Sequence, residues 1–211
     1  MKEIGKFSGT LLLVTVVAAG ALSAVNSVTK PRIERQQQLK TLEALGVALP
    51  GVPADAIESV SRDGRILYYV GYESPGSRRV VGYGVTGKGK GYAGDVETLV
   101  GVDTSFTIVG IRVLAQRETP GLGTKIVETR AGETVPYFQA QFVGRTAAQC
   151  KVDKDGGPIV SITGATISSR AVANGVAAAI DSLRLWLSSA AAREVAAEAD
   201  STKSLSPLMS Q

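Results

Sequence analysis

The sequence predicts an α+β protein with one N-terminal transmembrane helix, followed by a domain of antiparallel strands packed with helices. Three observations predict this fold class. Residues 7–29 contain no charged side chain, residues 66–114 hold several short segments rich in β-branched and aromatic residues, and residues 168–190 repeat apolar side chains at helical spacing. Helices packed on an antiparallel sheet are the arrangement that this order favours.

The uncharged N-terminal segment is long enough to cross a membrane. At about 1.5 Å per residue, residues 7–29 span a hydrocarbon core of roughly 30 Å. The small residues 19–21 also resemble a signal-peptide cleavage site, so a cleaved leader is the alternative. We favour a cytoplasmic stub and transmembrane helix over residues 1–29. Basic residues flank the segment on both sides, so charge alone does not fix its orientation.

A linker helix and loop are predicted for residues 30–60. Leu39, Leu42 and Leu45 lie three residues apart and give this helix a narrow apolar stripe, which Gly46 and two following prolines interrupt. The folded domain is assigned to residues 61–190. A helix end and flexible tail are assigned to residues 191–211.

The domain is expected to contain four strands. The β-forming segments are residues 66–72, 79–85, 96–102 and 106–114, and the last two are expected to pair as a hairpin. Residues 86–94 are so rich in glycine that an irregular loop is predicted there. Residues 116–125 form a second polar, glycine-rich loop at the end of a strand, either a plain turn or a ligand-binding loop.

Composition excludes several kinds of chemistry. The chain has no histidine and a single cysteine, Cys150, so histidine catalysis, an internal disulfide, an iron–sulfur cluster and a zinc site are not expected. Cys150 is interpreted as a small buried hydrophobic residue. The net charge of +4 comes from scattered side chains, and nucleic-acid binding is therefore not predicted. Any redox chemistry must come from an organic cofactor.

Residues 163–166, Thr-Gly-Ala-Thr, follow a short apolar run and precede the long helical pattern. Hydroxyl groups, a glycine and a helix N-terminus together favour phosphate binding. The alternative is a plain helix start, in which Thr163 or Thr166 caps the first turn.

Three motifs together resemble RnfG, the FMN-binding component of Rnf complexes, which are ion-translocating ferredoxin:NAD oxidoreductases. The motifs are residues 89–94 (Gly-Lys-Gly-Tyr-Ala-Gly), 118–123 (Glu-Thr-Pro-Gly-Leu-Gly) and 163–166, behind one membrane helix. The chain is similar, less closely, to the C component of the sodium-translocating NADH:quinone oxidoreductase. Where the family often carries an acidic residue three positions before the first threonine, this chain has Val160.

The resemblance implies an FMN-binding domain that carries electrons as part of a larger complex. It implies covalent attachment of FMN through a phosphoester to Thr166, installed by a separate flavin transferase. The remaining cofactor-binding residues would surround the phosphate linkage or the flavin ring, and they are Thr163, Gly164, Ala165, Glu118, Thr119, Leu122 and Gly123. No catalytic or metal-binding residue is predicted.

The resemblance also implies partners and a location. The partners would be other membrane, iron–sulfur and flavin subunits of an Rnf-type complex, and the domain would lie on the periplasmic or extracytoplasmic side of the cytoplasmic membrane. Two other functions stay open: an FMN-binding domain of another membrane electron-transfer system, or an anchored binding or scaffold protein without a cofactor.

Overall fold

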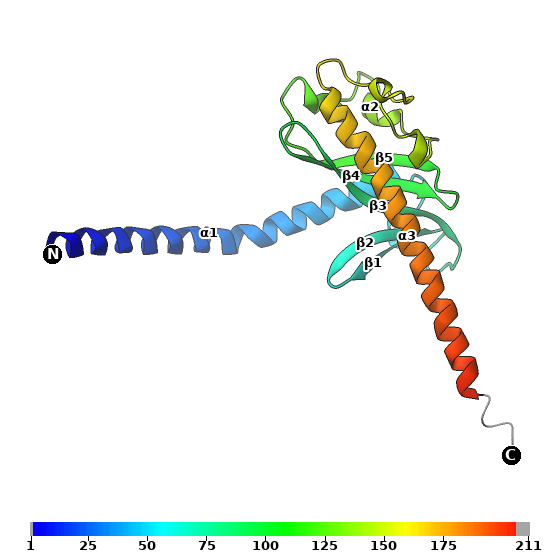
Figure 1. Ribbon diagram of the computed structural model, residues 1–211, viewed down its shortest axis with the longest axis horizontal. Coiled ribbons are helices and arrows are strands. Elements are labelled where there is room, and N and C mark those ends of the chain that lie inside the picture. Colours follow the sequence, from blue (N-terminus) through cyan, green and yellow to red (C-terminus); the bar gives the residue numbers. More distant parts are fainter. Residues whose placement is uncertain (1, 206–211) are drawn as a thin grey trace. The chain divides into compact units, whose positions relative to one another are not determined.

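The computed structural model describes the backbone of residues 2–205 and the side chains of residues 7–190 apart from 10, 34 and 38 (Figure 1). The chain divides into two compact units, residues 1–42 and 43–211. Each is described by itself below.

Helix α1 (Lys2–Ala48) is continuous, where the sequence predicts a transmembrane helix over residues 1–29 followed by a separate linker helix. Pro31 lies inside it, and a proline in a helix removes one backbone hydrogen bond. The residues that follow are mostly Glu, Gln, Lys, Arg, Leu and Ala, which are strong helix formers and continue the helix past the proline. The helix is long and apolar enough to cross a membrane.

The apolar side chains of the first unit are exposed. Leu11, Val17 and Leu22 keep more than 60 % of their surface exposed, and large apolar side chains remain exposed along the whole stretch. Two of its threonine hydroxyls bond within the helix: Thr15 Oγ1 donates to the Leu11 carbonyl at 2.8 Å and Thr29 Oγ1 to the Val25 carbonyl at 2.7 Å. Such internal pairing is what hydrocarbon surroundings require.

The second unit is built on a five-stranded antiparallel sheet in the order β1-β2-β3-β4-β5. The strands are β1 (Ile57–Arg62), β2 (Arg65–Tyr72), β3 (Val80–Lys90), β4 (Asp95–Asp103) and β5 (Ile108–Ala115). The predicted α+β class and the predicted hairpin of the last two strands are confirmed. Strand β1 is additional, and β3 continues through five residues of the segment predicted to be irregular.

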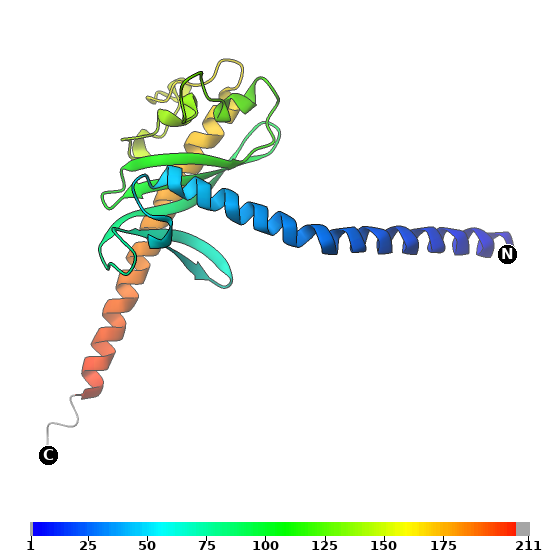
Figure 2. The ribbon, with the colours of Figure 1, turned by 180° about the vertical axis from the view of Figure 1, so that it is seen from behind.

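Helix α3 (Thr166–Leu205) crosses one face of the sheet (Figures 1 and 2). The crossing is close because β3 presents glycine there: a Cβ at Gly87 would overlap the Gly175 carbonyl, and one at Gly89 would overlap the Ala171 carbonyl. The glycines of this segment therefore serve helix-to-strand packing, which explains why a strand forms where composition predicts a loop. Residues 206–211 of the predicted tail lie outside the described residues.

The C-terminal end of α1 covers the opposite face of the sheet within the second unit. Ala44, Leu45 and Ala48 form a small buried cluster with Leu49 and the β4 residue Leu99. Glycine again permits the contact, since a Cβ on residue 101 of β4 would overlap the carbonyl of residue 48. A helix thus covers each face of the sheet, and small residues allow both helices to approach the strands closely.

Short elements connect β5 to α3. They are the 3₁₀ helices η2 (Gly123–Val127), η3 (Ala147–Gln149) and η4 (Asp153–Asp155) and the single-turn helix α2 (Tyr137–Ala140). Phe138 and Phe142 are fully buried and stack edge to face. Cys150 lies in the same core, where burial raises the pKa of its thiol to about 11. The thiol is therefore protonated and unreactive at neutral pH.

Candidate functional site

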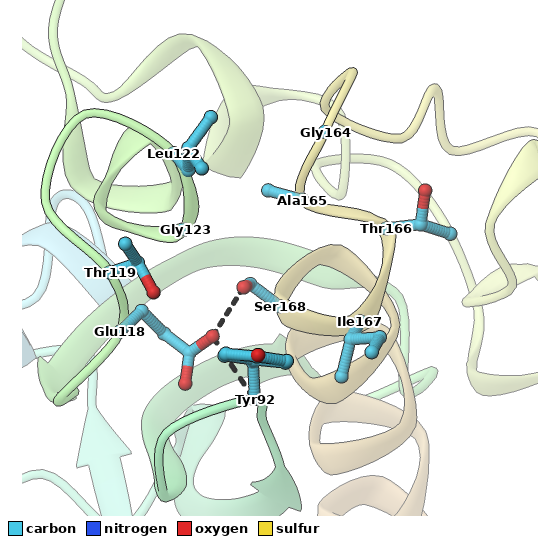
Figure 3. A pocket seen from close by; sticks show the side chains of 10 residues that line it. All are labelled: Tyr92, Glu118, Thr119, Leu122, Gly123, Gly164, Ala165, Thr166, Ile167 and Ser168. Carbon is cyan, nitrogen blue, oxygen red and sulfur yellow. Dashed lines mark hydrogen bonds between the residues drawn. The ribbon is translucent and has the colours of Figure 1, made fainter.

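A cavity of about 590 Å³ opens where the segment after β3, the loop after β5 and the start of α3 meet (Figure 3). Its lining residues are Tyr92, Glu118, Thr119, Leu122, Gly123, Gly164, Ala165, Thr166, Ile167 and Ser168. A cavity of this size accommodates a small organic ligand or cofactor.

Glu118 provides the fixed charge of this cavity. The residue is 4 % exposed, and its carboxylate accepts hydrogen bonds from the Tyr92 and Ala93 backbone N–H groups, both at 3.1 Å, and from the Ser168 hydroxyl (Figure 3). Burial acts to raise the pKa of Glu118, but the hydroxyl and the backbone N–H groups of residues 92–94 outweigh it and leave the pKa lowered. Glu118 is therefore ionised at neutral pH.

Glycine is required beside Glu118. A Cβ on Gly123 would lie 2.6 Å from both the Glu118 Cβ and the Ser168 Oγ, and a Cβ on Gly91 would overlap the Glu118 carboxylate. These distances are too short for any side chain. The glycines of the two loops thus let three chain segments converge on one carboxylate.

A tight turn precedes α3. The Ala165 N–H donates to the Ile162 carbonyl at 2.9 Å, and Gly164 adopts φ +77°, a conformation that favours glycine. The Ser169 hydroxyl closes the helix start, since it accepts from the Ile162 N–H and donates to the Ala165 carbonyl, both at 3.0 Å.

The threonines do not cap the helix. Among the described residues, the hydroxyl groups of Thr163 and Thr166 have no hydrogen-bond partner. Figure 3 shows Thr166 across the cavity from Glu118, with its side chain directed away from Glu118 and Ser168. Its hydroxyl is consequently available for bonding to a ligand.

The structure brings seven of the eight predicted site residues to this cavity. The eighth, Thr163, lines a second cavity instead, which shares the turn at residues 162–165 with the first. Tyr92, Ile167 and Ser168 were not predicted as site residues. Tyr92 lies within one of the three sequence motifs, and the other two directly follow Thr166, so proximity in sequence could have indicated all three.

The lining fits a flavin nucleotide. Tyr92, Leu122 and Ile167 are apolar groups left 73 %, 45 % and 47 % exposed at the cavity, where a flat aromatic ring would cover them. The first turn of α3 offers backbone N–H groups and the positive end of a helix dipole to a phosphate. An apolar wall and an anion-binding end thus occur in one cavity.

Comparison with known proteins agrees with this geometry. Residues 91–181 match the FMN-binding domain family, and residues 1–47 match the RnfG N-terminal region. All of the lining residues fall within the first of these ranges.

Similar proteins cover most of the chain. The G component of the ion-translocating oxidoreductase complex of Methanosarcina acetivorans is 37 % identical over 187 residues, which is 85 % of this chain and 94 % of the relative. The corresponding component from Cronobacter sakazakii is 34 % identical, over 83 % of this chain and 88 % of the relative. The G component of the Na(+)-translocating ferredoxin:NAD(+) oxidoreductase complex of Acetobacterium woodii is 33 % identical, over 83 % and 89 %.

These identities, their coverage of both chains and the two matching regions confirm the predicted family. The chain belongs to the RnfG family of Rnf-type ion-translocating oxidoreductase complexes and contains the FMN-binding domain of that family.

Proposed function

We propose that this protein is an electron-carrying subunit of an Rnf-type ion-translocating complex, with FMN attached through its phosphate to Thr166. One observation supports Thr166 as the attachment site. Thr166 is the first residue of α3, lines the cavity, and has a hydroxyl without a hydrogen-bond partner among the described residues.

The position of Thr166 suits a phosphoester. Such a linkage keeps one negative charge, and the N-terminal turn of a long helix stabilises an anion through its free N–H groups and dipole. The turn ahead of the helix is fixed by the Ser169 hydroxyl rather than by a threonine. Esterification of Thr166 therefore costs the fold no existing hydrogen bond.

The other lining residues hold and orient the flavin. Tyr92, Leu122 and Ile167 supply apolar contact area, and the Glu118 carboxylate holds the segment of residues 91–94 against the start of α3. FMN, when bound, supplies the capacity to accept and release electrons singly or in pairs. The chain contributes position and electrostatics, in keeping with its lack of histidine.

The location follows the same proposal. Residues 7–29 cross the cytoplasmic membrane once, the flavin domain lies on the periplasmic or extracytoplasmic side, and the membrane helix contacts other subunits of the complex. The length and apolar character of α1 support the membrane crossing. A flavin transferase is the partner during maturation, and membrane, iron–sulfur and flavin subunits are the partners afterwards.

The attachment is tested on the full chain coexpressed with a flavin transferase. After denaturation and electrophoresis, the wild-type band is expected to fluoresce under ultraviolet light, and the Thr166→Ala band is expected to be dark. Thr166→Ser keeps the hydroxyl and should retain some fluorescence. Thr104→Ala is the matched control, since it removes an exposed threonine at the turn between β4 and β5, away from the cavity, and should fluoresce fully. A fluorescent Thr166→Ala band would place the flavin elsewhere.

A further inference from the structure

A second cavity of about 480 Å³ is lined in part by the turn that precedes α3, which also lines the first cavity. Its lining contains two cationic side chains, four polar ones and no acidic one. The residues are Lys125, Arg130, Tyr137, Gln141, Val160, Ser161, Ile162 and Thr163. The cavity is therefore positively charged at neutral pH.

The two cations have no counter-charge of their own. Within the described part of the chain, neither Lys125 nor Arg130 forms an ion pair. Lys125 is half-buried, and the Arg130 guanidinium lies over the Tyr137 ring at 4.4 Å from its centroid. Two unpaired cations therefore line the same cavity, and a bound anion would neutralise their charge.

Some polar groups of this cavity already have hydrogen-bond partners, and the others are free to bind a ligand. The Gln141 side chain is already bonded to the backbone of Val160, and Ser161 is held at the Asp153 carboxylate, which accepts from the Ser161 backbone N–H at 3.0 Å. The hydroxyl of Thr163 has no partner among the described residues. One hydroxyl, one ammonium and one guanidinium group remain as donors, which is a set suited to the several oxygens of a phosphate.

We propose that this second cavity is a phosphate-binding site, with Lys125, Arg130 and Thr163 as its donors. Two ligands carry a phosphate group that this site would bind. One is the flavin nucleotide itself, because the turn at residues 162–165 forms a wall of both cavities; this source rests on the proposed function. The other is a separate phosphate-bearing solute.

The test measures binding of inorganic phosphate to the full chain in detergent, by ³¹P line broadening at constant ionic strength. Two forms are compared: flavinylated wild type and Thr166→Ala. In the Thr166→Ala background, Lys125→Gln/Arg130→Gln is expected to weaken phosphate binding about tenfold or more, since charge-assisted hydrogen bonds are lost. Arg65→Gln/Arg78→Gln removes the same charge from exposed positions outside the cavity and should change binding less than twofold.

A second, single substitution keeps the proposal testable if the Lys125→Gln/Arg130→Gln variant misfolds. Val160→Asp places a carboxylate on the cavity wall, where it competes with phosphate for the two cations, and it too should weaken binding about tenfold. Thermal unfolding of every variant accompanies the titrations.

The outcomes separate the two sources. Equal binding by the flavinylated wild type and Thr166→Ala supports a separate phosphate ligand, and binding by Thr166→Ala alone supports occupation by the flavin's own phosphate. Absence of binding to both forms, or binding that neither the double variant nor Val160→Asp weakens, overturns the site. Phosphate binding by the Thr166→Ala variants is read without flavin, so a failed attachment to Thr166, seen as a dark wild-type band after electrophoresis, leaves the test of the site unaffected and removes only the comparison of the two sources.

Discussion

Glu118 is the residue on which the cavity depends. It joins three segments that are far apart in sequence: its carboxylate is bonded to residues 92 and 93 and, across 50 positions, to Ser168. The sequence indicated Glu118 through its loop motif, but nothing local indicates the serine that pairs with it. Such a contact depends on the crossing of α3 over the sheet, so only the folded chain reveals it.

We predict that Glu118→Gln destabilises the fold by about 1–3 kcal/mol at neutral pH, because charge-assisted hydrogen bonds become neutral ones. The pKa of Glu118 is lowered in the folded chain. Its stabilisation is therefore present above the ordinary carboxyl pKa and is lost as pH falls through the lowered folded value. Urea unfolding across the acidic range should show the wild type converging on the variant as pH falls.

Asp103→Asn is the matched control for that prediction. Asp103 has a lowered pKa as well: burial opposes the shift, and the Ser105 hydroxyl with two backbone N–H groups outweighs it. It lies at the turn between β4 and β5 and lines neither cavity. Asp103→Asn should lose stability with a similar pH dependence and leave the absorption spectrum of the flavin unchanged, whereas Glu118→Gln should shift that spectrum. Identical spectra would contradict a role for Glu118 in the cavity.

At the scale of elements, the crossing of α3 over β3 sets the position of the cavity. We predict that Gly89→Ala costs about 3 kcal/mol, at the upper end of what overpacking costs, because the added methyl meets the Ala171 backbone. Backbone cannot move aside as a flexible side chain can. Denaturant unfolding measures the loss.

Gly46→Ala is the control for that substitution. Gly46 lies in α1 with open space at its Cβ position, so alanine there should leave stability unchanged or raise it by up to about 1 kcal/mol through helix propensity. Equal changes in the free energy of unfolding for the two substitutions would show that the close contact between α3 and β3 does not contribute to stability.

Strands were predictable where side chains carry the pattern. The segments of β2, β4 and β5 are rich in Val, Ile, Leu and Tyr, and their existence and the pairing of β4 with β5 were predicted. Strand β1 has only two apolar residues, Ile57 and Val60, so its sequence carries no strong strand pattern. The second half of β3 was missed because glycine, which normally weakens a strand, is there selected by the helix above it.

At the scale of the whole molecule, the chain combines an exposed apolar helix with a closed domain core. We predict that the full chain remains with the membrane fraction after alkaline carbonate extraction. Leu13→Lys/Val16→Lys should release it, because a lysine near the bilayer centre costs about 2.5–3.5 kcal/mol. Ile33→Lys/Leu39→Lys changes two exposed apolar residues of the same helix outside residues 7–29 and should leave the chain membrane-bound. Release of both variants alike would contradict the assigned span.

The bond between Glu118 and Ser168 has a consequence for the order of events during synthesis. The cavity walls come from residues 92–168, and the last of them belong to the first turn of α3. The ribosome must therefore complete that turn, and the helix must dock on the sheet, before the cavity exists. Loop closure over 50 residues makes this docking a late, non-local step. We therefore expect cofactor loading into this cavity to follow the docking of α3 on the sheet.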